Sequence, residues 1–554
     1  MGWTAAAGGS VRIDAIIDNA RVLTGDPRRP LASRIGIWQG RVVGLDEELD
    51  GARPDRRFDA EGGVLLPGFN DAHAHSVWFG QTLAELDLSA ARTPADVDRL
   101  IAERAGNLEG DAWVVAAGFN PLGMSGPLDR DALDRAAGGR PVWIKHTSGH
   151  AATLNGVGLA RIGVGDEPRP DPDGGVIVRD DRGRPTGLLE ENAMRLVQDV
   201  LLPDPLTAIE DALGRATAQY AREGITSVTD AGIAGGWIGH SPREFAAYQR
   251  ARDRGLLRTR MQAMVTLDAL ADLDGHVDDP RAIGLTAGIR SGIGDDRLQV
   301  GPVKVFTDGS LLGSTAAMSE DYAHDHGNHG YLQGDPKEMR ARVLAAAAGD
   351  WALALHAIGD AAVDFALDLI DEAQRLYGRG PLPSRIEHGG VVRPDQLDRM
   401  ARLGVALVPQ PRFIAEFGDG MAAKLGAERT HRSYPAASVL RAGAVLAGSS
   451  DRPVAPGEPL RIVQSFVERR TESGAPYGPD ERLTVEQALR ACTAGAAQAT
   501  GWGGRKGVLA RGMLADIVAL GDDPRAVPTD RIGQIDVVAT LVGGEAVHGA
   551  LAER

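Results

Sequence analysis

The chain has 554 residues, of which 60 are basic and 76 acidic, and its formal net charge at pH 7 is −16. This length exceeds one ordinary hydrophobic core, so two or three domains are expected. The acidic balance disfavours nucleic acid and anionic membranes as partners and leaves a small molecule as the expected one. The single cysteine, Cys492, excludes an internal disulfide framework and a cysteine-based metal cluster, and we expect it in the core.

Both ends of the sequence carry short strand patterns. From Ile13 to Val64, apolar runs alternate with turn signals, including a hairpin that turns at Gln39–Gly40. Strand patterns return at 512–520 and 537–544. The economical arrangement is one β-sandwich built from both termini, and the alternative is two unrelated β appendages. With no signal segment and no apolar run of membrane-spanning length in the sequence, we expect a cytoplasmic protein without membrane contact.

The first candidate for chemistry follows an apolar run, Val64 to Leu66, which predicts a buried strand ended by a proline–glycine pair. His73 and His75 come next. Positions i and i+2 of an extended chain face the same side, so both imidazoles can point at one ion. The plainer alternative is a pair of surface-loop histidines. Asp71 is either an acceptor that orients an imidazole or a solvated turn residue.

The interval from residue 81 to residue 222 is too long for a loop and predicts an inserted subdomain. After it, strand and helix patterns alternate regularly. The first predicted strand is the one at Val64–Leu66, and seven more follow at 224–230, 260–265, 300–306, 351–356, 384–388, 405–410 and 442–446. Strands separated by helices in this way favour a (β/α)8 TIM barrel. The runner-up is an open doubly wound sheet, which would begin with a glycine-rich phosphate loop that the sequence lacks.

The predicted organisation therefore has five segments. They are 1–63, the N-terminal part of the β-sandwich; 64–80, barrel strand 1 with the metal motif; 81–222, the inserted subdomain that caps the site; 223–500, the remainder of the barrel; and 501–554, the C-terminal part of the sandwich.

Ionisable residues stand at the ends of four more predicted strands: Lys304, His356, His388 and Asp451. The carboxyl ends of barrel strands meet at one site, so these side chains are expected to converge with the two leading histidines. Imidazoles with a carboxylate suit Zn²⁺ or a similar borderline cation. Each residue also has a structural alternative: a core histidine, an ion pair between Lys304 and a nearby acid such as Asp308, or a helix N-cap at Asp451.

This set, following a leading His-x-His, resembles the amidohydrolase superfamily. The resemblance is nearest to its amidohydrolase 3 branch, which includes N-substituted formamide deformylase-like proteins, and it extends from about residue 12 to about residue 550. It implies a divalent metal site that holds one or two ions, with Zn²⁺ as the expected cation. The implied metal ligands are His73, His75, Lys304, His356 and His388. Lys304 would bridge two metals as an N6-carboxylated (carbamylated) side chain, and Asp451 would transfer protons.

The resemblance also implies an activity, which is the hydrolysis of a C–N bond (amide, N-acyl or N-formyl) in a small molecule by metal-activated water. The same ligands would serve hydrolysis of an ester, lactone or cyclic amide, deamination or isomerisation, and a non-catalytic scaffold is the remaining alternative. His150, Asp308 and Gln410 are candidates for substrate contacts. The inserted subdomain is expected to cover the mouth of the site, and a homodimer is possible.

Overall fold

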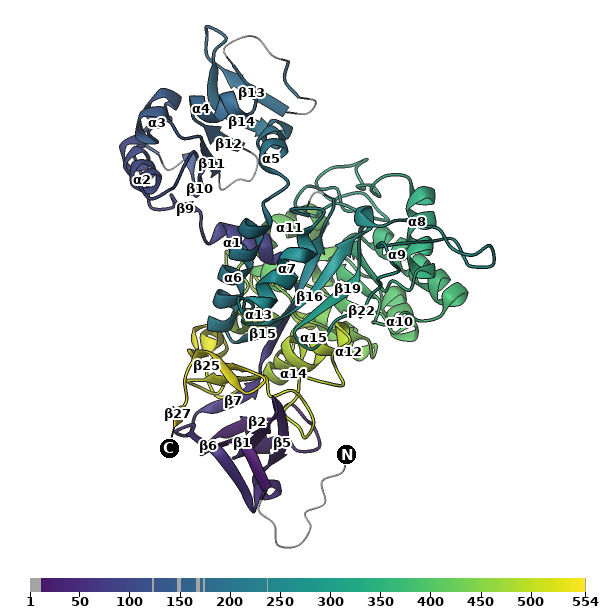
Figure 1. Cartoon of the computed structure of the whole chain (residues 1–554). Coiled ribbons are helices and arrows are strands. Elements are labelled where there is room, and N and C mark those ends of the chain that lie inside the picture. The colour runs from purple at the N-terminus through teal and green to yellow at the C-terminus, as the bar shows by residue number, and fades with distance from the viewer. Residues whose placement is uncertain are drawn as a thin grey trace. The chain divides into compact units, whose positions relative to one another are not determined.

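The computed structural model describes residues 11–121, 124–146, 151–165, 170–172, 175–236 and 238–553. The chain divides into two compact units (Figure 1). The larger unit combines Met1–Phe79 with Leu206–Arg554, and the smaller unit is Gly80–Pro205.

The larger unit is built around an eight-stranded sheet whose neighbouring strands all run parallel. In spatial order the strands are β8 (Phe69–Ala74), β15 (Ile225–Ile233), β16 (Arg260–Thr266), β19 (Leu298–Phe306), β20 (Leu353–Ala357), β21 (Arg385–His388), β22 (Ala406–Val408) and β23 (Val445–Leu446). Backbone hydrogen bonds join β8 to the segment after β23: Ala72 N donates to Gly448 O over 3.4 Å, and Asp451 N donates to His73 O over 2.7 Å. The predicted (β/α)8 barrel is confirmed.

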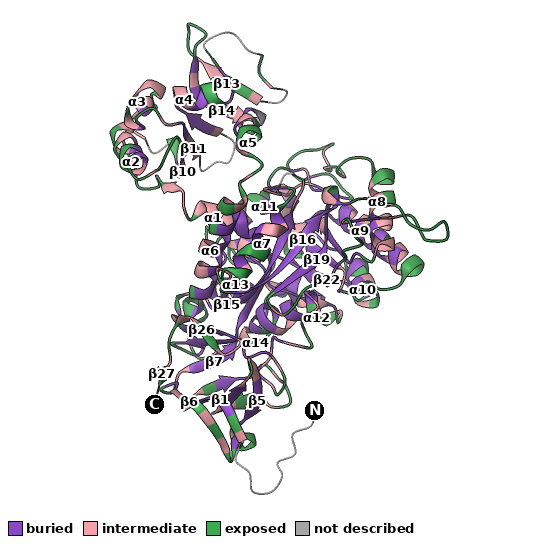
Figure 2. Cartoon of the chain, in the orientation of Figure 1, coloured by how far each residue is buried: buried purple, intermediate pink, exposed green. Residues whose placement is uncertain are grey.

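Helices surround this sheet and turn their exposed faces outward (Figure 2). They are α1 (Ser76–Thr82), α6 (Leu206–Arg222), α7 (Glu244–Asp253), α8 (Pro336–Ala348), α9 (Asp360–Tyr377), α10 (Pro394–Leu403), α11 (Arg412–His431), α12 (Ala436–Arg441), α13 (Pro459–Glu468), α14 (Val485–Arg490) and α15 (Ala496–Ala499). In α9, the buried residues include Val363, Ala366, Leu367 and Ile370. This spacing places one apolar stripe against the sheet. A short hairpin, β17 (Ala271–Leu273) with β18 (Ala282–Gly284), follows β16.

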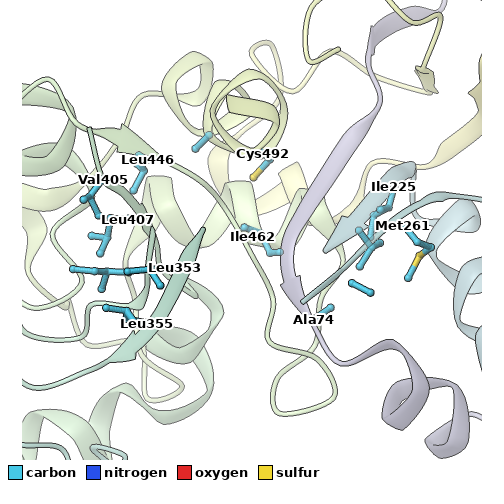
Figure 3. Close-up of a cluster of buried hydrophobic side chains, with 14 of the residues drawn as sticks. Ala74, Ile225, Met261, Leu353, Leu355, Val405, Leu407, Leu446, Ile462 and Cys492 are labelled. Atoms are coloured by element: carbon cyan, nitrogen blue, oxygen red, sulfur yellow. The ribbon is translucent and has the colours of Figure 1, made fainter. Parts of the chain in front are cut away.

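The core between sheet and helices is apolar (Figure 3). On β20, Leu353 and Leu355 lie in this core and are at most 2% exposed. Alternate strand residues point to opposite faces, so His356 is directed to the other side, into the barrel. Burial of each such leucine stabilises the fold by about 1.5–3 kcal/mol. Cys492 is 2% exposed in the same core, as the sequence predicts.

Two further sheets pack on each other at one end of the barrel and draw strands from both termini (Figure 1). The first contains β27 (Ala552–Glu553), β6 (Ala52–Asp59), β1 (Val11–Asp18), β4 (Ile35–Trp38) and β5 (Arg41–Leu45). The second contains β26 (Glu545–Gly549), β25 (Val537–Val542), β24 (Ile517–Leu520), β7 (Val64–Pro67), β2 (Arg21–Leu23) and β3 (Leu31–Ala32). Neither sheet is complete without the other end of the chain, so the composite sandwich is confirmed.

The apolar run Val64–Leu66 does not belong to the barrel. It forms β7, which lies between β24 and β2 in the sandwich, and the first barrel strand is the next segment, β8. Every residue of both strands is buried, but β8 carries Asn70, Asp71 and His73, so an apolar run marks only β7 as a buried strand. The boundary is Gly68, where a Cβ would stand 2.2 Å from the side chain of Thr226. Only glycine permits that approach of the chain to β15.

The smaller unit contains one six-stranded sheet in the order β13-β14-β12-β11-β10-β9. Its strands are β9 (Leu86–Asp87), β10 (Val114–Phe119), β11 (Val142–His146), β12 (Ala151–Leu154), β13 (Gly175–Arg179) and β14 (Pro185–Glu191), and its helices are α2 (Pro94–Gly106), α3 (Arg130–Ala136), α4 (Gly156–Arg161) and α5 (Arg195–Leu201). Helix α6, which the sequence places within the inserted segment 81–222, lies in the larger unit. Among the described residues, no helix combines the length and apolarity needed to cross a bilayer.

Candidate metal centre

Seven of the predicted residues come together at the carboxyl ends of the barrel strands. They line one cavity of about 400 Å³ and are His73, His75, Lys304, Asp308, His356, His388 and Asp451. Neighbouring strands are in register there: His356 pairs with Phe306, and His388 pairs with Ala357. Residues as far apart in the sequence as His73 and Asp451 thus reach one point because parallel strands end together. His150 lies outside the described residues.

The tightest part of the site is formed by His73, His75 and Asp451. The Nε2 atoms of His73 and His75 lie 3.3 Å and 3.0 Å from Asp451 Oδ1. One ligand atom from each of the three residues falls within 4.8 Å of the others, and all three residues are buried. Burial would raise the pKa of Asp451, but hydrogen bonds and charge from His73 and His75, when these rings are protonated, hold it well below its usual value. The carboxylate is therefore ionised at neutral pH.

The ring of His73 is oriented by a buried carboxylate. His73 Nδ1 donates to Glu387 Oε2, and Arg385 Nη2 donates to the same oxygen over 2.9 Å. All three side chains have no exposed area. Although burial opposes it, the charge of Arg385 keeps the pKa of Glu387 low. With Nδ1 occupied as a donor, the lone pair of His73 is on Nε2, the nitrogen that faces Asp451.

The other two barrel histidines are held in the same manner. His388 Nδ1 donates to Gln410 Oε1 over 2.7 Å, and His356 Nε2 donates to the carbonyl of Gly309 over 2.9 Å. Burial lowers the pKa of His356 to about 3 and also lowers that of His388. Both rings are neutral at pH 7, so each keeps one nitrogen with a free lone pair for a ligand.

Lys304, on β19, is 1% exposed, and burial lowers the pKa of its amine to about 8. Its Nζ stands 4.8 Å from the centre of the Phe306 ring. The structure shows no ion pair between Lys304 and Asp308, both of which it describes. Lys304 therefore does not pair with Asp308, and the acids whose charges act on it most strongly are Glu387 and Asp451.

Asp308 and Gln410 are buried beside two of the histidines. Asp308 has no exposed area, accepts from the backbone N–H groups of Ala317, Ile358 and Gly359, and lies 3.4 Å from His356 Nε2. Burial raises its pKa to about 7. Gln410 does not line the cavity, and its amide nitrogen donates to Val408 O and Ser449 Oγ. These contacts position His388.

The loop that carries Asp451 is anchored on both sides. Before it, Ser450 donates to Asp71, whose carboxylate also accepts from the backbone of His73. Asp71 is buried and thus ties β8 to this loop, and it does not orient an imidazole. After it, Arg452 pairs with Glu223 over 2.8 Å. Asp451 itself has φ 57°, in the left-handed region that non-glycine residues rarely adopt, and such strain is concentrated at functional sites.

Three residues that support the site are not among the candidates predicted from the sequence: Glu387, Arg385 and Arg452. A signal existed for the first two, because an acid and a base at i and i+2 of a strand face the same side and can pair inside the barrel. The partner of Arg452, Glu223, precedes β15 and is far away in sequence. No local pattern indicates that pair.

A divalent metal fits this set of donors. Within the described chain, His73 Nε2, His356 Nδ1 and Asp451 Oδ1 are buried atoms without a hydrogen-bond partner. Buried polar atoms are normally paired, because an unpaired one costs about 1–3 kcal/mol. Neutral imidazole nitrogens and a carboxylate oxygen are also the ligand types that borderline cations prefer.

Comparisons with known proteins agree with this architecture. A family model described as "Amidohydrolase family" matches residues 56–548. An N-substituted formamide deformylase from Arthrobacter pascens is 29% identical over 549 residues, covering 96% of this chain and 97% of that protein. The protein LONG AFTER FAR-RED 3 of Arabidopsis thaliana is also 29% identical, over 548 residues that cover 97% of this chain and 91% of the plant protein.

Among solved structures, an uncharacterized metal-dependent hydrolase from Pyrococcus horikoshii superposes with a TM-score of 0.75 at 24% identity. The match covers 93% of this chain and 99% of that one. At this identity the likeness establishes the shared fold.

Proposed function

This chain belongs to the amidohydrolase family, and we propose that it is a metal-dependent hydrolase that cleaves a C–N bond, an amide, N-acyl or N-formyl bond, in a small molecule. The observation that carries the proposal is the buried set of imidazole nitrogens and a carboxylate oxygen, which line one cavity and have no hydrogen-bond partner in the described chain. The name of the A. pascens relative points to the same class of bond.

Five side chains would hold the metal: His73, His75, His356, His388 and Lys304 in its N6-carboxylated form. Zn²⁺ is the cation that this donor set suits best. When bound, a divalent cation supplies Lewis acidity, which lowers the pKa of water and polarises a carbonyl group. Lys304 can join the set because an amine with a pKa of about 8 is partly neutral near pH 7.5, and the neutral amine is the form that adds carbon dioxide.

Asp451 moves the proton. Its ionised carboxylate accepts a proton from the attacking water as the oxygen–carbon bond forms, and it then donates this proton to the leaving nitrogen as the C–N bond breaks. Glu387 and Gln410 keep His73 and His388 in their tautomers throughout. Asp451 is only 6% exposed, so its carboxylate is largely shielded from bulk solvent.

The proposal is tested with Asp451→Asn in the metal-loaded enzyme against a panel of N-formyl, N-acyl and cyclic amides and their ester analogues. We expect kcat on the best amide to fall about 10²–10⁴-fold, with metal content, measured by elemental analysis, equal to that of the parent. The matched control is Asp335→Asn, an exposed helix cap outside the cavity, which should change neither quantity. Amide turnover by Asp451→Asn at the parent rate would contradict the assignment.

A further inference from the structure

The cavity continues from the metal centre to a surface made almost entirely of hydrocarbon. We call this surface the apolar wall, and it consists of Leu311, Leu312, Phe413, Phe417, Met421 and Tyr434. The wall joins three segments: the connection after β19, helix α11, and the turn before α12. It belongs to the same cavity as His73 and Asp451, so a molecule that reaches the metal centre also meets the wall.

Helix α11 places three of these side chains on one stripe. Phe413, Phe417 and Met421 are four residues apart, and side chains at this spacing share one face of a helix. The rings of Phe413 and Phe417 meet edge to face with their centroids 5.4 Å apart, and Phe413 meets Tyr434 at 6.5 Å. Four of the wall residues also pack in a separate buried cluster, which holds them in place. Phe417 is only half-buried, so part of its ring is free to contact a ligand.

Charged groups are confined to the inner end of the cavity. Among the described residues that line it, Lys304 is the one Lys or Arg side chain, and it lies in the buried cluster with the histidines. The carboxylate of Asp308 already accepts hydrogen bonds from three backbone N–H groups. Lys424 of α11 lies nearby, but its Nζ donates to Leu312 O and Ser314 Oγ and it does not line the cavity. A carboxylate or ammonium group held against the wall would lose its hydration and find no opposite charge among the residues that line the cavity there, which is costly.

We propose that the substrates carry a neutral apolar group, best an aromatic ring, on one side of the scissile bond, and that the apolar wall binds this group. The inference rests on the proposed function, because it takes the reacting bond to lie at the metal centre. A cavity of about 400 Å³ is near the lower end for small-molecule sites, which favours a single ring over an extended chain.

The test uses two inert ketones that share a methyl ketone and a two-carbon spacer, 4-phenyl-2-butanone and levulinate. Their dissociation constants are measured by calorimetry on the metal-loaded full chain. We expect the phenyl ketone to bind the parent at least about tenfold more tightly, the effect of burying one aromatic ring. Phe417→Lys should shift the ratio of the two constants at least about tenfold toward levulinate, and Phe417→Ser should weaken only the phenyl ketone.

The matched control is Ala423→Lys, which adds the same charge at an exposed position of α11 that does not line the cavity. It should leave the ratio within about twofold of the parent value. Levulinate binding the parent as tightly as the phenyl ketone, or an unchanged ratio in Phe417→Lys, would overturn the proposal. Neither ketone is hydrolysed, so a preference for the phenyl ketone in a protein that hydrolyses no amide would refute the proposed function alone.

Discussion

Replacing Glu387 by Gln separates the positioning of His73 from its chemistry. In the parent, Glu387 accepts from His73 and from Arg385, and none of these side chains is exposed. The amide removes the negative charge, so the guanidinium of Arg385 stays buried without its counter-ion. Removing one partner of a buried ion pair costs about 3–5 kcal/mol. The free energy of unfolding of the barrel should fall by that amount.

Metal affinity should fall as well, because an amide no longer favours the tautomer that places the lone pair of His73 on Nε2. Loss of such a supporting contact weakens metal binding about 10–100-fold. The assay is competition for Zn²⁺ with a chelator of known affinity, combined with hydrogen exchange of β8 and β21. Glu210→Gln, a buried acid that pairs with Arg250 and Arg254 away from the cavity, is the control and should keep the parent affinity.

A double variant, Arg385→Met with Glu387→Met, removes both buried charges. Replacing a whole buried ion pair by apolar side chains is often neutral for stability. The double variant should therefore recover most of the free energy of unfolding while its metal affinity stays as low as that of Glu387→Gln. If Glu387→Gln instead binds Zn²⁺ within about twofold of the parent, then Glu387 does not position His73 and the reasoning is refuted.

Two further predictions concern stability. Asp516→Asn leaves Arg260 and Lys506 buried without the carboxylate that now lies 2.8 Å and 2.9 Å away, and should cost about 3–5 kcal/mol; a melting temperature equal to the parent's would contradict this. Burial raises the pKa of Glu244 from 4.5 to about 7, so its protonation stabilises the fold fully below pH about 4.5, and this contribution is lost as pH rises through about 7. In urea unfolding at pH 5 and pH 7.5, Glu244→Gln should reduce the drop in the free energy of unfolding between the two pH values, by about 3 kcal/mol at most. A drop as large as that of the parent would contradict this.

The sequence by itself determined the family, the barrel and the residues that meet at its mouth. The family match confirms the resemblance that begins at His73 and His75. The convergence of Lys304, His356 and His388 was predictable because parallel strands carry side chains of alternating direction and end at a common edge. Hydrophobic periodicity is a local property, and a barrel repeats one local pattern.

Only the tertiary structure decided which atoms of those residues are available. The tautomer of His73 depends on Glu387, which is 314 residues away. The boundary between β7 and β8 depends on the close contact of Gly68 with Thr226. The apolar wall likewise combines side chains of α11 with side chains of a loop that is distant in sequence. These features come from packing between segments far apart in sequence, and the periodicity of a single segment carries no information about its neighbours in space.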